Sequence, residues 1–426
     1  MPADAATLFE GFFRELERRD IPAVVIHGYE NMPEQMPSDI DFAVRCQDLP
    51  KLLRIQREIA ARQGWVLASV VHAKLFALYT VFFDAQDPSR FIQLDACGHY
   101  VERGCFVLRD EEFLQARRRN RGFSIPPPAT EFGYLLAKAL IKSKPIGPAL
   151  TRLRTLHEAD PAGTSAMFSR LVGAASGRLS EWFRRPAEEW NRDLRPRVRR
   201  RTRLGPVNLM REAGRAFRRI LRPAGMQLVI FGPDGAGKST LISRLGTLSC
   251  FRRQRQFHFR PHLFDKKSGP VVTRPHAQSP RPVFSSLAKT LYYFADHWLG
   301  YWLNVFPARV RNELVIFDRS FADQWIDPRR YRLAGVEAWA RFLKRLLPKP
   351  DFTVVLDAEP EVIHARKPEL AIEELRRQRE ALRNLAAATA HCAVIPAAES
   401  PERVEQLVRQ KLIAFLAGRE QRRHPD

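Results

Sequence analysis

The chain has 426 residues, enough for two or three domains, and its apolar fraction of 45% excludes a disordered or fibrous protein. Its formal charge of +23 favours an anionic partner such as a nucleotide, nucleic acid, acidic glycan or membrane face, unless it reflects only an arginine-rich proteome and one basic segment. Five scattered cysteines without a CxxC pair exclude a zinc ribbon or disulfide framework and fit a reducing cytoplasm.

The N-terminus carries early acidic residues and lacks the apolar segment of a signal peptide. The sequence contains no run of about 18 apolar residues, so we expect no membrane-spanning helix. The nearest approach is the segment 291–306, which Asp296, His297 and Asn304 interrupt, so we expect a buried or pocket-lining helix there. We therefore expect a cytoplasmic protein, with peripheral contact at the inner membrane face left open.

Residues 1–145 alternate helical and strand patterns, which predicts an α+β domain. The apolar spacing predicts helices at Thr7–Arg19, Leu49–Arg62 and Glu131–Lys142 and strands at Ala23–His27, Ile40–Val44, Leu75–Phe83 and Phe91–Ala96.

Three carboxylates in this domain have the spacing of a metal site. Asp39 and Asp41 point to the same side of a strand, and Asp95 ends a later strand. Carboxylates placed in this way can share Mg²⁺ and position a nucleoside triphosphate. Gly28, after the first strand, supplies a turn on the phosphate side.

Residues 146–225 differ in amino-acid composition from the segments on either side and are expected to form a basic helical linker. Between Arg178 and Arg222 there are 15 arginines, no lysine and 5 acids, a net charge of +10. The segment 207–222 has amphipathic helical spacing, with five arginines opposite an apolar face. Such a helix can lie on an anionic membrane, but we favour a connecting helix packed against the next domain with its arginines in solvent.

From residue 226 to 417, strands and helices alternate, which predicts a parallel sheet with flanking helices, and 418–426 is expected to be a polar tail. An apolar strand, a GxxxxGK[ST] loop and a helix follow one another, as a P-loop requires. The backbone of such a loop cradles phosphates while its lysine reaches the β and γ phosphates and its serine holds Mg²⁺. The residues expected to bind ATP are Gly232, Asp234, Gly235, Ala236, Gly237, Lys238, Ser239 and Thr240.

Further candidate catalytic residues follow two later strands. Asp318 ends one of them, where a P-loop fold places an acid that contacts Mg²⁺, and Arg319 beside it can grip an anionic acceptor. Arg366 lies in a loop that can close over the phosphates and stabilise the transition state, and Lys367 is the alternate.

The segments 231–240, 317–320, 356–366 and 377–385 resemble thymidylate kinase, and the resemblance covers about residues 226–416. It implies transfer of the γ-phosphoryl group of ATP to an acceptor, with Mg²⁺. The segment between Arg366 and Glu373 is shorter than the usual lid of that family. The insert before Asp318 resembles thymidylate-kinase-like proteins of bacterial surface-polysaccharide clusters more than it resembles a housekeeping nucleotide kinase. The resemblance therefore implies an acceptor that is thymidylate or another phosphorylated or glycan-type anion.

The N-terminal pattern of a glycine turn, Asp39, Asp41 and a later strand acid resembles the DNA polymerase beta-type nucleotidyltransferases. Gly28 is followed by Tyr29 where that family has serine, and Pro33 and Pro37 interrupt the expected helix. The resemblance implies nucleotidyl transfer; the alternative is a domain that only binds a substrate or partner.

The sequence thus predicts a magnesium-dependent kinase of the P-loop NTPase fold, fused to a nucleotidyltransferase-like domain. The competing hypotheses are an ATP-binding regulator or membrane-docked protein without phosphoryl transfer, and a nucleic-acid binder, which the absence of interleaved aromatic and basic residues disfavours. The oligomeric state is open.

Overall fold

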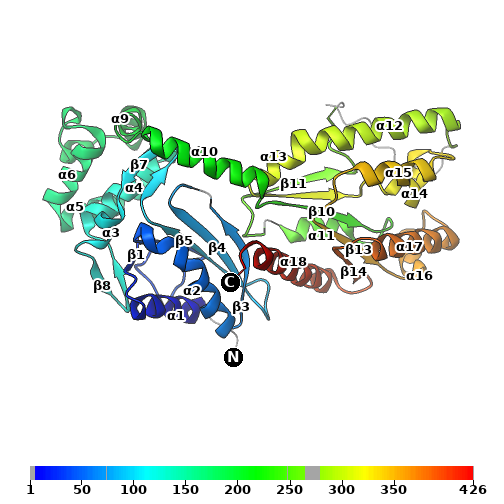
Figure 1. Ribbon diagram of the computed structural model, residues 1–426, viewed down its shortest axis with the longest axis horizontal. Coiled ribbons are helices and arrows are strands. Elements are labelled where there is room, and N and C mark those ends of the chain that lie inside the picture. Colours follow the sequence, from blue (N-terminus) through cyan, green and yellow to red (C-terminus); the bar gives the residue numbers. More distant parts are fainter. Residues whose placement is uncertain (1–4, 73, 247, 264–278, 426) are drawn as a thin grey trace. The chain divides into compact units, whose positions relative to one another are not determined.

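The computed structural model describes residues 5–72, 74–246, 248–263 and 279–425. The chain forms two compact units (Figure 1). The first unit comprises Met1–Arg218 and Glu420–Asp426, and the second comprises Arg219–Arg419. Both are mixed α/β structures, and the helical content of the chain is 53%.

A mixed five-stranded sheet in the order β1-β2-β5-β4-β3 forms the framework of the first unit. Its strands are β1 (Ala23–Val25), β2 (Asp39–Val44), β3 (Trp65–Val71), β4 (Ala77–Asp84) and β5 (Phe91–Cys97). Only β2 and β5 run parallel, and the other neighbours are antiparallel. The strand β3 was not expected from the sequence, whereas the other four lie close to their predicted positions.

The two faces of this sheet are covered by different helices because side chains alternate along each strand. The helices α1 (Ala5–Arg18) and α2 (Leu49–Arg62) pack on the face that carries Ile40 and Phe42. The helix α4 (Pro128–Lys142) packs on the opposite face, with Ala43 and Cys97. Asp39 and Asp41 alternate with Ile40 and Phe42, so they lie on the α4 side.

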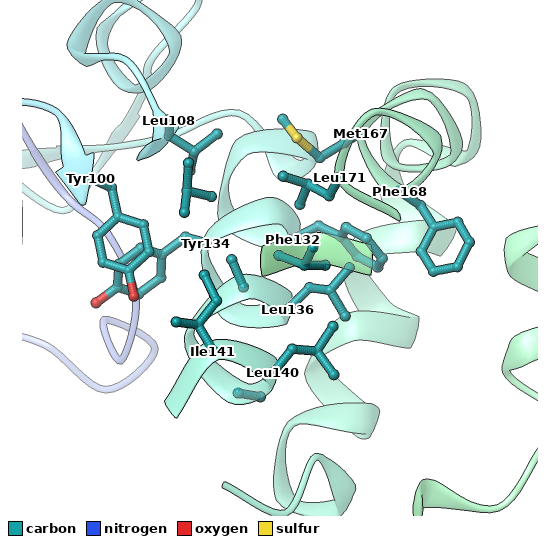
Figure 2. Close-up of a cluster of buried hydrophobic side chains, with 14 of the residues drawn as sticks. Tyr100, Leu108, Phe132, Tyr134, Leu136, Leu140, Ile141, Met167, Phe168 and Leu171 are labelled. Atoms are coloured by element: carbon teal, nitrogen blue, oxygen red, sulfur yellow. The ribbon is translucent and has the colours of Figure 1, made fainter. Parts of the chain in front are cut away.

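The segment expected to begin the linker instead belongs to the core of the first unit. Helices α5 (Gly147–Ala159), α6 (Pro161–Val172), α7 (Leu179–Trp182), α8 (Ala187–Glu189) and α9 (Arg195–Arg201) follow α4. Figure 2 shows Phe168 and Leu171 of α6 beside Phe132 and Leu136 of α4. Trp190 is fully buried in the same cluster. These apolar residues are sparse among the arginines, which is why composition alone suggested a solvated linker.

Smaller elements complete the first unit. The strand pairs are β6 (Tyr100–Glu102) with β7 (Cys105–Leu108) and β8 (Arg118–Asn120) with β9 (Phe123–Ile125), and α3 is Asp110–Leu114. Of the expected linker, α10 (Pro206–Leu221) remains as the helix in which the first unit ends and the second begins.

The second unit contains the parallel sheet that the sequence predicts. Its order is β11-β12-β10-β13-β14, and every neighbouring pair is parallel. The strands are β10 (Met226–Phe231), β11 (Arg253–His258), β12 (Glu313–Asp318), β13 (Phe352–Asp357) and β14 (Cys392–Pro396). Its α-helices are α11 (Lys238–Leu245), α12 (Val283–Gly300), α13 (Phe306–Val310), α14 (Asp323–Ile326), α15 (Glu337–Leu346), α16 (Pro360–Arg366), α17 (Ile372–Ala387) and α18 (Pro401–Arg423).

Two expectations for this half differ from the structure. The segment 291–306, in α12 and the π-helical turn after it, was expected to be buried or to line a pocket, but Trp298, Trp302 and Leu303 are exposed to solvent. The segment 418–426 was expected to be a polar tail, but α18 continues through Arg423. Among the residues that the structure describes, none of the helices has the length and apolarity that crossing a bilayer requires.

Candidate functional site

The topology of the second unit brings the candidate kinase residues to one edge of its sheet. After β10 the chain forms β11 and then β12, which both lie on one side of β10 in the sheet. The next strands, β13 and β14, lie on the other side of β10. In open α/β sheets, ligands bind at the carboxyl ends of the strands where the strand order reverses in this way. The glycine-rich loop 232–237 follows β10, Asp318 ends β12, and Asp357 ends β13.

The loop after β10 has the backbone conformation that its glycines permit. Gly235 and Gly237 have φ values of 92° and 86°, a left-handed region that residues with a Cβ rarely adopt. The helix α11 begins at Lys238, so its unpaired N–H groups and positive end lie beside the loop. Ser239 and Thr240 are exposed there. The loop therefore offers the donors that a polyphosphate needs.

Lys238 is buried and has its ammonium group directed into the loop. Its Nζ donates to the carbonyl oxygens of Gly232 at 2.7 Å and Pro233 at 2.9 Å. Burial, and then the nearby charge of Arg319, lowers the pKa of Lys238 to about 8, while Asp234 and Asp318 oppose that shift. The structure thus holds Lys238 by exchangeable carbonyl contacts, and a phosphate can replace them.

The lowered pKa of Lys238 predicts how ATP affinity depends on pH. Below pH 8 the ammonium group is already charged, so the dissociation constant of ATP is expected to be flat with respect to this group. Above pH 8 binding requires uptake of a proton, and the dissociation constant is expected to rise about tenfold per pH unit. Calorimetric titration of ATP at a series of pH values measures this slope. A Lys238→Met protein should bind more weakly and lack the slope; an equal slope in that protein would assign it to another group.

Asp318 has one carboxylate oxygen without a partner. Its Oδ2 lies 3.1 Å from Nδ1 of His258, whereas its buried Oδ1 has no hydrogen-bond partner. Burial alone would raise the pKa of Asp318, but the hydrogen bond from His258 and the charge of Lys238 hold it below its ordinary value. An ionised oxygen that is buried without a partner is costly, and a cation would relieve that cost. Asp318 and the exposed Ser239 therefore fit the donors of a magnesium ion.

Arg319 is the centre of a buried charge network. It is 4% exposed, donates to Asp234 of the P-loop, and lies 3.5 Å from Asp323. Arg330 also donates to Asp234, at 2.5 Å. Burial would lower the pKa of Arg319, but Asp323, Tyr331 and Asp234 hold it above its ordinary value. The network fixes a permanent cation next to the glycine-rich loop, and such a guanidinium group can bind an anion.

The structure directs Arg366 and Lys367 to different places. Arg366, the last residue of α16, donates to the carbonyl oxygens of Ala397 and Ala398 at 2.8 and 3.4 Å. Lys367 lies over the loop, since a Cβ built on Gly235 would be 3.2 Å from the Cβ of Lys367. In this conformation Lys367, the alternate candidate, has its Cβ beside the glycine-rich loop, while its ammonium group pairs with Glu369 at 3.2 Å. Arg379 and Arg383 of α17 bind Asp357.

Aromatic and cationic side chains gather on the acceptor side of Arg319. Phe259 stacks on Tyr331 at 4.4 Å between ring centroids, and Lys289 donates to the carbonyl oxygen of Tyr331 at 2.8 Å. The fully buried Gln324 has neither amide atom hydrogen-bonded, and the hydroxyl group of Tyr331 is likewise buried without a partner. The sequence indicated the arginines of this segment but not Gln324, which only burial reveals.

In the first unit, the three candidate carboxylates meet on one face of the sheet. Asp41 and Asp95 lie directly opposite each other on the parallel strands β2 and β5, and Asp39 is two residues before Asp41. Burial, and then the charge of Asp41, raises the pKa of Asp95 to about 7. Burial and Asp41 also raise the pKa of Asp39. Asp41 and Asp95 line a pocket with Lys74, His99 and Tyr134.

Two side chains of the chain itself, Lys138 and His27, already contact this carboxylate group. The Nζ of Lys138 in α4 lies 2.7 Å from Oδ2 of Asp41, and Nε2 of His27 lies 2.7 Å from the same oxygen. Burial alone would raise the pKa of Asp41, but His27 and Lys138 hold it well below its ordinary value. Lys138 was not among the site residues expected from the sequence, although a lysine in the interior of the apolar helix 131–142 was a usable signal.

Tyr29, at the position where the nucleotidyltransferase resemblance calls for serine, has a structural role. Its hydroxyl group donates to Glu131 at 2.5 Å and accepts from Arg152 at 2.6 Å. Glu131 is fully buried, and Arg152 also donates to it at 2.8 Å. Gly28 has a φ of 73°, so the expected turn is formed, but the side chain that follows it is committed to α4 and α5.

Comparison with known proteins finds no match from which a function could be inferred. No protein-family model matches the chain, and no curated protein is found as a relative of it. The residues described above are therefore the basis of what we propose.

Proposed function

We propose that the second unit is an ATP- and Mg²⁺-dependent phosphotransferase that moves the γ-phosphoryl group to an anionic acceptor. One observation carries the proposal. A buried lysine at the start of a helix, a carboxylate oxygen without a partner and a buried arginine converge at the carboxyl edge of a parallel sheet. Each of these groups corresponds to a part of the phosphoryl-transfer machinery.

The proposed mechanism is in-line transfer assisted by positioning and charge. Lys238 exchanges its carbonyl contacts for the β and γ phosphates, and the N–H groups at the start of α11 bind phosphate oxygens. Asp318 and Ser239 would hold the magnesium ion, which supplies charge neutralisation at the phosphates when bound. Arg319 would orient the acceptor, and Lys367, whose Cβ lies close to Gly235, would stabilise charge at the phosphates after leaving Glu369.

The acceptor class follows from the side chains around Arg319. Arg319 and Arg330 favour a phosphorylated or otherwise anionic group, and the rings of Phe259 and Tyr331 add an apolar surface. Thymidylate, other nucleoside monophosphates, and phosphorylated or lipid-linked sugars all have this chemistry.

The experiment is ATP turnover by the purified full chain with Mg²⁺ against that acceptor panel. Turnover that depends on one acceptor supports the proposal and identifies the substrate. Tight ATP binding with no turnover on any acceptor would favour an ATP-binding regulator instead.

A second activity, nucleotidyl transfer by the first unit, is favoured by the opposition of Asp41 and Asp95. Asp39, Asp41 and Asp95 offer the oxygen donors that would hold Mg²⁺, which supplies charge neutralisation at a triphosphate when bound. Lys138 competes with that use, because its ammonium group already neutralises Asp41.

Removing Lys138 is expected to strengthen metal binding at the first unit. A Lys138→Met protein leaves Asp41 and Asp95 without this countercharge, so its affinity for Mn²⁺ should rise at least about tenfold, the result of losing one close charge pair. Electron paramagnetic resonance measures the concentration of free Mn²⁺. The Lys138→Met protein and its parent should both carry Asp318→Asn, which removes the proposed metal site of the second unit. Unchanged affinity would show that Lys138 does not compete with a metal ion.

A further inference from the structure

The helix α10 (green in Figure 1) presents its apolar side to solvent. No residue of this 16-residue helix is buried. Met210 is 76% exposed, Leu221 65%, Val207 64% and Phe217 60%. Large apolar side chains at this exposure are unfavourable in water, and a contiguous group of them marks a surface that binds something.

The arginines of α10 lie on the other side, where Arg215 and Arg219 donate to backbone carbonyl oxygens and Arg218 and Arg222 are exposed. Arg215 donates to the carbonyl oxygen of His72 at 2.9 Å, and Arg211 lies over the ring of Phe76 at 5.9 Å. Both contacts are within the first unit. Arg219 donates to the carbonyl oxygen of Val310 at 2.6 Å, within the second unit. The apolar side was expected to pack inward with the arginines in solvent; instead the apolar side is exposed and Arg215 and Arg219 are turned toward the protein.

The two kinds of side chain are strictly separated around the helix. At 100° per residue, the apolar positions fill an arc of roughly 160°, and the five arginines fill a separate arc of roughly 100°. The apolar positions are Val207, Leu209, Met210, Ala213, Gly214, Phe217, Ile220 and Leu221, and the basic ones are Arg211, Arg215, Arg218, Arg219 and Arg222. Arg211, Arg218 and Arg222 are exposed and border the apolar arc on one side.

We propose that the apolar side of α10 docks the protein on an anionic membrane surface. The helix would lie in the plane of the interface, since its length of about 24 Å and its arginines do not suit a membrane span. Acyl chains and glycerol groups receive Met210 and Phe217, and Arg211, Arg218 and Arg222 reach lipid phosphates at the border. The net charge of +10 between Arg178 and Arg222 adds long-range attraction.

The same charge argues against a second copy of the chain as the occupant. Two copies of α10 that paired through their apolar sides would bring two rows of exposed arginines together. Glu212, the one acid in the helix, is held by Arg215 and is not available to neutralise them. An anionic lipid surface satisfies the apolar and the basic features at once. This inference is independent of the proposed kinase activity.

The test is cosedimentation of the full chain, without nucleotide, with vesicles of phosphatidylcholine and with vesicles of equal parts phosphatidylcholine and phosphatidylglycerol. We expect binding to the anionic vesicles that weakens with salt. The Met210→Ser/Phe217→Ser protein should bind at least about tenfold more weakly, because two large side chains no longer enter the bilayer. The Arg211→Gln/Arg218→Gln protein should lose about fivefold per arginine.

The matched control is Trp339→Ser/Phe342→Ser, which removes exposed aromatic side chains from α15 in the second unit and should leave vesicle binding unchanged. All substituted residues are exposed, so circular dichroism and thermal unfolding should match the wild-type protein. Binding that survives the α10 substitutions, or that is equal on neutral vesicles, would overturn the proposal. A dimer in sedimentation equilibrium that Met210→Ser/Phe217→Ser abolishes, without vesicle binding by either protein, would assign the surface to a second copy.

Discussion

Replacing Lys238 by alanine is expected to lower kcat/KM for phosphoryl transfer by about a hundredfold to a thousandfold, the usual effect of losing one preorganised charge at a developing anion. Lys238 is 6% exposed, and its ammonium group is held at the loop by the carbonyl oxygens of Gly232 and Pro233, so it needs only to exchange these contacts for phosphate oxygens when the nucleotide binds. Most of the loss should appear in kcat if the lysine contacts the phosphates more strongly in the transition state than in the ground state.

The control for this substitution is Lys349→Ala, which removes one exposed lysine from the same unit and should leave kcat/KM within about twofold of wild type. Thermal unfolding of both proteins separates loss of function from loss of fold. A Lys238→Ala protein that folds and turns over ATP at the wild-type rate would remove the P-loop from the mechanism.

The second large effect is on stability. Replacing Arg319 by methionine is expected to lower the free energy of unfolding of the second unit by about 3–5 kcal/mol. The substitution leaves the carboxylates of Asp234 and Asp323 without their shared buried cation. Denaturant titration followed by tryptophan fluorescence measures the loss.

Arg330→Met is the matched comparison, because Arg330 binds the same Asp234 but its side chain is 21% exposed. Its effect should be smaller, about 1–2 kcal/mol, since solvent screens the charge that remains. Equal effects from the two substitutions would mean that Arg319 is not the centre of the network.

The parallel sheet of the second unit could be predicted because its strands are continuous apolar runs that end in chemically distinctive residues. The P-loop and Asp318 follow two such runs, at Leu228–Phe231 and Leu314–Phe317. The carboxyl ends of parallel strands lie at the same edge of a sheet. The proximity of the glycine-rich loop and Asp318 could therefore be predicted once both strands were assigned to one parallel sheet.

What could not be predicted depends on contacts between distant parts of the chain. The helices within 147–201 carry many arginines, and only their packing against α4 shows that Trp182 and Trp190 form a core. The pairing of Lys138 with Asp41 joins residues 97 positions apart. The contacts of Arg366 with Ala397 and Ala398, and those of Arg215 and Arg219 in α10 with backbone carbonyl oxygens, depend in the same way on tertiary structure.

The most direct test of the central proposal is phosphorus NMR of ATP, Mg²⁺ and the acceptor panel with the purified wild-type chain, and with the Asp318→Asn protein in parallel. We predict that the γ-phosphate signal is replaced by a new signal of a phosphorylated acceptor, and that Asp318→Asn slows this at least about a hundredfold. Release of inorganic phosphate alone, or transfer at the same rate by both proteins, would contradict the assignment of this site as a phosphotransferase.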